Sequence, residues 1–183
     1  MTQPRLRCHL LIGPPGSGKT TLARDLAPLL RGDAGQPAVL LSTDGIRAEL
    51  FGDAAVQGPW QEICAVLLQR LKAAVAAGSP VIIDATNARR PWRLLYTQQL
   101  ELPAPVVWIG WWLTTPLPTC LAWAGRRQRP VPEAVIRQFH AAIHNSQCGP
   151  CCAEGFAAVV TLNPAARESE PDALRTQLEK LNH

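Results

Sequence analysis

The chain has 183 residues, enough for one buried core, with 47% hydrophobic and only 17% charged residues. This composition is that of a folded globular domain and excludes an intrinsically disordered chain. The formal net charge of +4 is a modest excess that does not by itself indicate nucleic-acid binding.

Hydrophobic runs in this chain are short. None approaches the roughly 20 residues that a membrane-spanning helix needs. The first eleven residues have neither a long apolar region nor a small-residue cleavage site, so they do not fit a signal peptide. We therefore expect a cytoplasmic protein without a membrane partner.

Strand and helix patterns alternate along the chain. Short apolar runs that end in turn residues predict strands, and apolar residues three or four positions apart predict helices. The first half predicts strands over 5–12, 38–41 and 81–84, and helices over 19–30, 46–51, 60–77 and 89–100. The second half predicts strands over 105–113 and 156–162, and helices over 116–125, 133–144 and 172–181.

Strands that are apolar throughout and alternate with helices are typical of a parallel sheet covered on both faces. The strand over 105–113 is apolar on both faces and is expected to lie inside the sheet. We therefore expect an α/β fold: a single three-layer P-loop NTPase domain over 1–183, with a five-stranded parallel sheet and a helical lid at about 126–132.

A glycine-rich loop between the first strand and the first helix matches the motif G-x-x-x-x-G-K-[ST] in full. Its residues are Gly13, Pro14, Pro15, Gly16, Ser17, Gly18, Lys19 and Thr20, followed by Thr21. The backbone N–H groups of such a loop form a nest for phosphate oxygens, and the following helix adds its positive dipole end. We expect a nucleoside triphosphate here, ATP with Mg²⁺, with Lys19 reaching the β- and γ-phosphates and Thr20 ligating the metal.

The rest of the sequence narrows the class of nucleotide-binding protein. The guanine-reading motif Asn-Lys-x-Asp is missing, which argues against a switch GTPase. A mechanical ATPase usually carries two acids after its third strand, whereas here only Asp84 stands there, followed by Ala85. These features favour a small kinase. An ATP-binding regulatory or switch module that hydrolyses slowly is the alternative.

Two acidic strand ends are candidates for the second half of the site. In open α/β sheets, the loops at the carboxyl ends of the strands face the ligand crevice. Asp44 can accept the proton of an attacking hydroxyl there, and Arg47, three residues on, can hold an acceptor phosphate. Helix capping by Thr43 and Asp44 is the structural alternative, although an aspartate can cap a helix and still act as a base.

Asp84 closes the third strand, a usual position for an acid that acts on the metal through water. It is also the second candidate for general base, and capping or turn formation is its structural alternative. Asn87 follows in the same crevice loop and is a candidate substrate contact.

A basic segment follows the helix predicted over 116–125. It contains Arg126, Arg127 and Arg129 between prolines, which suits a lid that closes over the triphosphate and places a guanidinium on the γ-phosphate. A solvated basic face is the alternative.

These motifs together resemble the P-loop kinases typified by the kinase domain of polynucleotide 5′-kinase, grouped with zeta-toxin-like proteins often labelled AAA-family ATPases. Four blocks carry the resemblance, in the family's order: GPPGSGKTT at 13–21, STDGIR at 42–47, IDATN at 83–87, and the segment 126–136 with its VPEAVI. The blocks are spread along the chain, so the resemblance spans most of residues 6–140.

The resemblance implies roles for individual residues. The aspartate matching Asp44 is the family's general base, and the arginine matching Arg47 contacts the acceptor phosphate. Arginines of the lid, here Arg126, Arg127 and Arg129, contact the donor phosphates. The family's acceptors range from nucleic-acid ends to small molecules, so the acceptor stays open.

Two further residue groups invite a functional interpretation. His140, His144, Cys148 and Cys151 have a spacing that could hold Zn²⁺ tetrahedrally, with a redox-sensitive or inert loop as the alternative. Cys8, Cys64 and Cys120, and the tryptophans at 108, 111 and 112, stand in apolar contexts and are expected to pack in the core.

Overall fold

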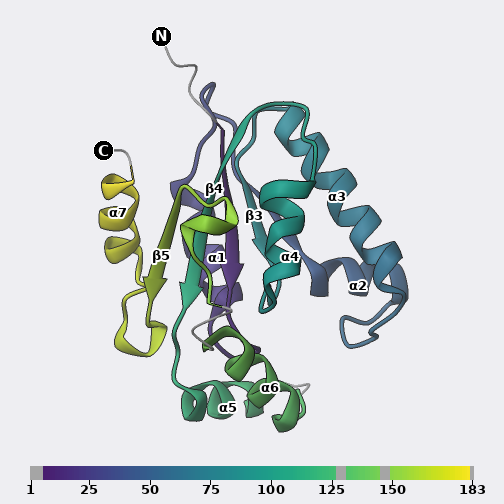
Figure 1. The fold of residues 1–183 in the computed structure, drawn as a ribbon, viewed down its shortest axis with the longest axis vertical. Helices are drawn as coiled ribbons and strands as arrows, with labels where there is room; N and C mark the ends of the chain where they lie inside the picture. Colours follow the sequence, from purple (N-terminus) through teal and green to yellow (C-terminus); the bar gives the residue numbers. More distant parts are fainter. Residues whose placement is uncertain (1–5, 127–130, 145–148, 182–183) are drawn as a thin grey trace.

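The computed structural model describes residues 6–126, 131–144 and 149–181. Five strands form one sheet in the order β2-β3-β1-β4-β5, and every neighbouring pair is parallel (Figure 1). The strands are β1 (Leu6–Ile12), β2 (Val39–Ser42), β3 (Val81–Asp84), β4 (Val106–Leu113) and β5 (Ala158–Leu162). This confirms the predicted α/β fold and its five-stranded parallel sheet. It also confirms that β4 is an inner strand.

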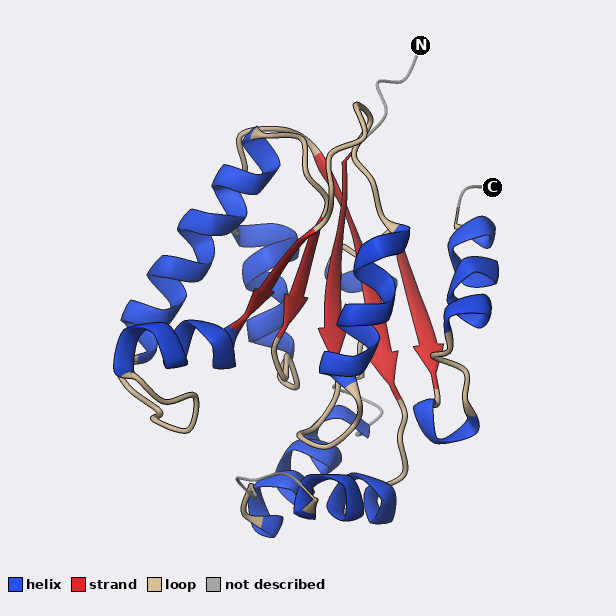
Figure 2. Ribbon diagram, turned by 180° about the vertical axis from the view of Figure 1, so that it is seen from behind, coloured by secondary structure: helices blue, strands red, loops and turns tan. Residues whose placement is uncertain are grey.

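Helices cover both faces of the sheet. On one face lie α1 (Lys19–Leu26) and α7 (Pro171–Lys180), whose Leu22, Leu26 and Leu174 are buried against β1 and β4 (Figures 1 and 2). On the other lie α3 (Trp60–Ala76) and α4 (Arg90–Leu94). Helix α3 buries Ile63, Leu67 and Leu71, one per turn, as its predicted apolar face requires.

Three helices lie at the edge where the strands end. They are α2 (Thr43–Phe51), which follows β2 directly, and α5 (Leu117–Gly125) and α6 (Glu133–His144), which pack on each other below the sheet in Figure 1. Cys120 and Ala124 of α5 and Ile136 of α6 form their shared apolar contact. Because all strands point the same way, the loops that carry the candidate site gather at this edge.

Two predicted helix boundaries were wrong for local reasons. The first helix ends at Leu26 instead of residue 30, and Pro28 is accommodated in the short 3₁₀ helix η1 (Ala27–Leu29). Helix α2 begins at Thr43, not at Ile46. Its N-cap is Ser42, whose hydroxyl accepts a hydrogen bond from the Gly45 N–H at 3.4 Å, so neither Thr43 nor Asp44 is the cap.

The helix predicted over 89–100 is composite. Regular helix α4 covers its first part, and the π-helical turn η2 (Leu95–Gln99) continues it. The strand predicted from residue 156 starts at Ala158, although Phe156 is still buried in the core. A short 3₁₀ helix, η3 (Cys152–Glu154), lies between α6 and this strand. Among the described residues, no helix is both long and apolar enough to cross a bilayer.

Candidate functional site

The glycine-rich loop lies between β1 and α1, as predicted, and α5 packs against it. Gly16 and Gly18 have left-handed φ angles of 80° and 99°, which glycine adopts without strain. A Cβ atom at Gly16 would lie 2.2 Å from the carbonyl oxygen of Cys120 in α5. The loop and α5 therefore pack backbone to backbone, and glycine at position 16 is a packing requirement as well as a conformational one.

The ammonium of Lys19 is held inside this loop. Its Nζ donates hydrogen bonds to the carbonyl oxygens of Gly13 at 2.9 Å and Pro14 at 2.8 Å, and the side chain is buried. A buried ammonium inside a backbone loop fits the phosphate-binding role that the sequence predicts for Lys19.

Thr20 and Asp84 come together at the mouth of the loop. The Thr20 hydroxyl donates a hydrogen bond of 2.9 Å to Oδ2 of Asp84, which is buried at the end of β3. The sheet brings them close because β3 is the direct neighbour of β1. Hydroxyl and carboxylate oxygens are the donors that Mg²⁺ prefers, so this pair fits the predicted metal role by its chemistry.

Asp44 and Arg47 form a second charged pair on the adjacent strand end. Arg47 Nη1 lies 2.7 Å from Oδ1 of Asp44, with the Asp44 side chain 65% exposed and the Arg47 side chain 16% exposed. Ser42, the last residue of β2, pairs in register with Asp84, the last residue of β3. Asp44 comes two residues after Ser42, in the first turn of α2. The two acids thus share the edge but differ in surroundings: Asp84 faces the loop, and Asp44 faces solvent.

Asn87 lies in the turn after β3 with a φ angle of 47°. Its buried amide donates a hydrogen bond of 2.7 Å to the carbonyl oxygen of Leu11 in β1. One residue earlier, the Thr86 carbonyl accepts a 3.1 Å hydrogen bond from the Gly13 N–H. These bonds dock the turn on the phosphate loop, a role that the sequence did not indicate.

Thr115 is a site residue that sequence reasoning missed. Its buried hydroxyl donates a 2.7 Å hydrogen bond to the carbonyl oxygen of Ser17 in the loop. It follows β4, so the same rule that singled out Asp44 and Asp84 at strand ends could have found it.

The predicted lid lies only partly within the described residues. Arg126 follows α5 directly and is exposed, whereas Arg127 and Arg129 lie outside the part of the chain that the structure describes. Arg126 caps the end of α5, and α5 packs against Gly16 of the phosphate loop.

The candidate zinc ligands are also divided. The imidazole rings of His140 and His144 are stacked with centroids 4.0 Å apart. Burial, and to a lesser extent the charge of His144, lowers the pKa of His140. Cys148 lies outside the described residues, within which no group of three or more His, Cys, Asp or Glu is placed to hold a metal. Zinc binding stays a prediction. Cys8, Cys120, Trp108 and Trp111 are buried, as predicted, whereas Cys64 and Trp112 are only partly buried.

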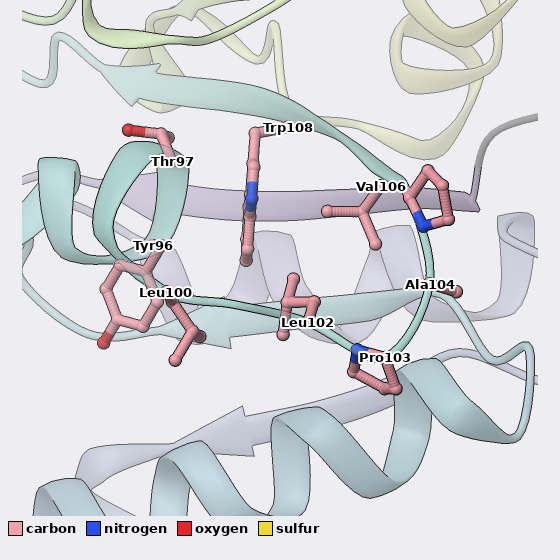
Figure 3. Close-up of a pocket in the computed structure, with 9 residues that line it drawn as sticks. Tyr96, Thr97, Leu100, Leu102, Pro103, Ala104, Val106 and Trp108 are labelled. Atoms are coloured by element: carbon pink, nitrogen blue, oxygen red, sulfur yellow. The ribbon is translucent and has the colours of Figure 1, made fainter.

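A hollow of about 380 Å³ lies at the opposite edge of the sheet, beside the start of β4 (Figure 3). Tyr96, Leu102 and Trp108 line it, among other mostly apolar residues. Since the phosphate loop is at the carboxyl end of the strands, this hollow is separate from the candidate site.

The family model described as an AAA domain matches residues 8–145. No curated protein matches the chain by sequence. Among solved structures, the chain is similar to one in the Pnkp1/Rnl/Hen1 RNA repair complex, with 19% identity and a TM-score of 0.66 over 80% of this chain. That match covers 46% of the other chain, so this chain spans less than half of its length.

Two further structures match over nearly their whole length. Shikimate kinase from Acinetobacter baumannii, in complex with shikimate, has 20% identity and a TM-score of 0.60 over 98% of this chain and 94% of that one. Kti12 from Chaetomium thermophilum, in complex with ADP-AlF3, has 17% identity and a TM-score of 0.67 over 95% and 96%. Identities this low show the shared fold alone.

Proposed function

The chain belongs to the AAA-domain family of P-loop, nucleotide-binding proteins, and from that premise we propose that it is an ATP-dependent phosphotransferase. It moves the γ-phosphoryl group of ATP to a hydroxyl of an acceptor, either a nucleic-acid 5′-end or a small molecule. The observation that carries the proposal is that two neighbouring acids at strand ends have different partners and different exposure to solvent. Asp84 is bonded to the phosphate loop, and Asp44 is open to solvent.

The donor side is built from the loop. Its backbone N–H groups and the ammonium of Lys19 bind the phosphate oxygens, and Arg126, Arg127 and Arg129 close over the γ-phosphate. Thr20 and Asp84 would hold Mg²⁺, Asp84 through water. Bound Mg²⁺ neutralises charge on the β- and γ-phosphates. Structures of this fold accommodate such ligands, as the Kti12 complex with ADP-AlF3 illustrates for that protein.

The acceptor side is built from Asp44 and Arg47. The exposed carboxylate of Asp44 accepts the proton of the attacking hydroxyl. The hydroxyl oxygen then bonds to the γ-phosphorus while the bond to the bridging oxygen of ADP breaks, and Asp44 passes its proton to water. Arg47 orients the carboxylate at 2.7 Å and can turn its guanidinium to an acceptor phosphate.

Asn87 remains a proposed acceptor contact. Its amide is already bonded to Leu11, which supports a structural role for that half of the side chain. The acceptor pocket would lie between α2, the turn after β3 and the helices α5 and α6, all of which meet the carboxyl edge of the sheet (Figure 1).

The test is an acceptor screen with labelled ATP and Mg²⁺. Oligonucleotides with a free 5′-hydroxyl, nucleosides, sugars and hydroxy acids are offered to the purified protein. We expect one class to accelerate ATP consumption and to carry the label, and Lys19→Ala to abolish both effects. If the protein hydrolyses ATP slowly and no acceptor accelerates this hydrolysis, the protein is a regulatory ATP-binding module and not a kinase.

A further inference from the structure

A buried ion pair joins α4 to the segment before β5. Arg93 Nε and Nη2 donate hydrogen bonds of 2.6 and 2.7 Å to the two carboxylate oxygens of Glu154, a bidentate arrangement. The two side chains are 0% and 1% exposed. Glu154 lies in η3, outside the stretch 8–145 that the family model matches. The pair therefore ties a segment beyond the matched region to an element within it.

The other edge of the same guanidinium holds the turn after β3. Arg93 Nη1 donates to the carbonyl oxygens of Ala88 at 2.9 Å and Asn87 at 3.2 Å. One planar guanidinium thus donates hydrogen bonds to a carboxylate and to two backbone carbonyls at once. A lysine cannot reproduce this, because its ammonium is a point donor without the rigid fork.

The turn that Arg93 grips is the one that docks on the phosphate loop. Within three residues it presents the Thr86 carbonyl to the Gly13 N–H and the Asn87 amide to the Leu11 carbonyl. The turn begins at Asp84, whose carboxylate accepts the hydrogen bond from Thr20. A continuous series of hydrogen bonds therefore runs from Glu154 through Arg93 and the turn to the mouth of the loop.

We propose that Arg93 and Glu154 are positioning residues that hold the turn after β3 against the phosphate loop and so set Asp84 beside Thr20. The catalytic consequence rests on the proposed function, but the placement of the turn does not. Stability alone is a poor reason for such a pair, because an apolar pair of similar volume stabilises a core at least as well. What an apolar pair cannot do is hold two backbone carbonyls in place.

That difference defines the test. The double variant Arg93→Met with Glu154→Leu keeps an apolar, packed core but has no donor for the turn. Hydrogen exchange of the Gly13 N–H reports directly whether the turn is docked, and the N–H of Leu10 in β1 reports on the sheet. We expect protection at Gly13 to fall at least about tenfold and protection at Leu10 to persist. Unchanged protection at Gly13 in the folded variant overturns the proposal.

The matched control is the exposed pair Arg137 and Glu133 on α6, which receives the same substitutions. Arg137→Met with Glu133→Leu should leave protection at Gly13 as in the wild type. Should the buried double variant not fold, Arg93→Lys supplies the same comparison. It keeps the charge and loses the fork, and its Gly13 protection must fall for the proposal to stand.

A second readout separates positioning from a merely structural role. With the acceptor found by the screen, the double variant should need roughly tenfold more Mg²⁺ for half-maximal rate and lose about tenfold in kcat. The KM for ATP should stay within about twofold of wild type, since the loop itself is intact. A wild-type Mg²⁺ requirement despite lost Gly13 protection contradicts positioning. If the wild type has no acceptor-dependent turnover, the proposed function fails, and the Gly13 exchange still decides whether the pair holds the turn.

Discussion

Two carboxylates share one edge of the sheet, yet their partners give them different chemistry. Asp84 is buried, and its carboxylate accepts a hydrogen bond from the Thr20 hydroxyl, so it faces the phosphate loop. Asp44 is exposed and paired with Arg47, so a hydroxyl arriving from solvent can reach it. Their position was predictable from the strand-end rule. Arg47 lies three positions from Asp44 on the same helix, so the proximity of these two follows from helical spacing. The hydrogen bond from Thr20 to Asp84 joins residues 64 positions apart and depends on β3 lying next to β1.

Lys19 is the residue whose loss should affect nucleotide binding most directly. Its ammonium lies inside the loop, bonded to the carbonyl oxygens of Gly13 and Pro14. Lys19→Ala should weaken Mg·ATP binding roughly 10- to 100-fold, as expected when charge-assisted hydrogen bonds are lost. Calorimetric titration measures this. Lys72→Ala, on the exposed side of α3, is the control and should bind as wild type.

The fold of Lys19→Ala should be intact by circular dichroism and thermal melting, because the strand and helix on either side pack through apolar residues. Wild-type affinity in a folded Lys19→Ala protein would mean that this loop is not the triphosphate site.

At the scale of elements, α5 connects the phosphate loop with the predicted lid. Cys120 and Ala124 face Gly16, and Arg126 follows at the end of the same helix. Arg126 therefore lies next to a helix that packs on the loop backbone.

The lid arginines should act mainly in the transition state. Replacing Arg126, Arg127 and Arg129 singly by alanine should, for at least one of them, lower kcat about tenfold or more while raising KM less. Steady-state kinetics with the acceptor measure both constants, and Arg137→Ala, exposed on α6, is the control. Wild-type turnover in all three variants would make the segment a solvated basic face.

Strand β1 carries a titratable group in the core. His9 is fully buried, and its Nδ1 accepts a 2.9 Å hydrogen bond from the indole N–H of Trp111 on β4. Burial, and to a lesser extent Arg7, lowers the pKa of His9 to about 3. Between about pH 6.5 and pH 3, the unfolded chain therefore binds a proton that the folded chain does not, and the free energy of unfolding falls as the pH falls.

Between pH 7 and pH 5 this linkage should remove about 2 kcal/mol from the free energy of unfolding. His9→Asn keeps an acceptor oxygen at the position of Nδ1 and does not titrate, so it should lose correspondingly less over the same range. Urea denaturation of both proteins at the two pH values measures the difference. Equal losses in the two proteins would show that His9 is protonated in the folded state.

Element types were predictable from the sequence, and several element ends were not. The apolar runs of β1, β3 and β4 and the one-per-turn leucines of α3 are local patterns that tertiary contacts reinforce. The start of α2 was misplaced because Thr43 and Asp44 were interpreted as the cap of a helix that begins at Ile46, whereas Ser42 caps a helix that includes them.

At the scale of the whole molecule, the sheet order explains why the site is assembled where it is. With β1 at the centre and β3 and β2 beside it, the loop, Asp84 and Asp44 line up along one edge. The sequence predicted this half of the site from motifs near strand ends. It did not predict the Arg93–Glu154 pair, whose two residues lie 61 positions apart and leave no local pattern. Thr115 follows a strand and was within reach of the strand-end rule, but the residue that it binds, Ser17, lies 98 positions away.

The central claim is that the protein transfers a phosphoryl group with Asp44 as base, and the comparison of Asp44→Asn with Asp84→Asn tests it most directly. Mg·ATP affinity and acceptor-dependent rate are measured for both variants, with Asp33→Asn in an exposed loop as control. Asp44→Asn should bind Mg·ATP within about twofold of wild type and transfer roughly 10²- to 10⁴-fold more slowly. Asp84→Asn should instead raise the Mg²⁺ requirement. Transfer at the wild-type rate by Asp44→Asn, together with an inactive Asp84→Asn, would contradict the claim and make Asp84 the base.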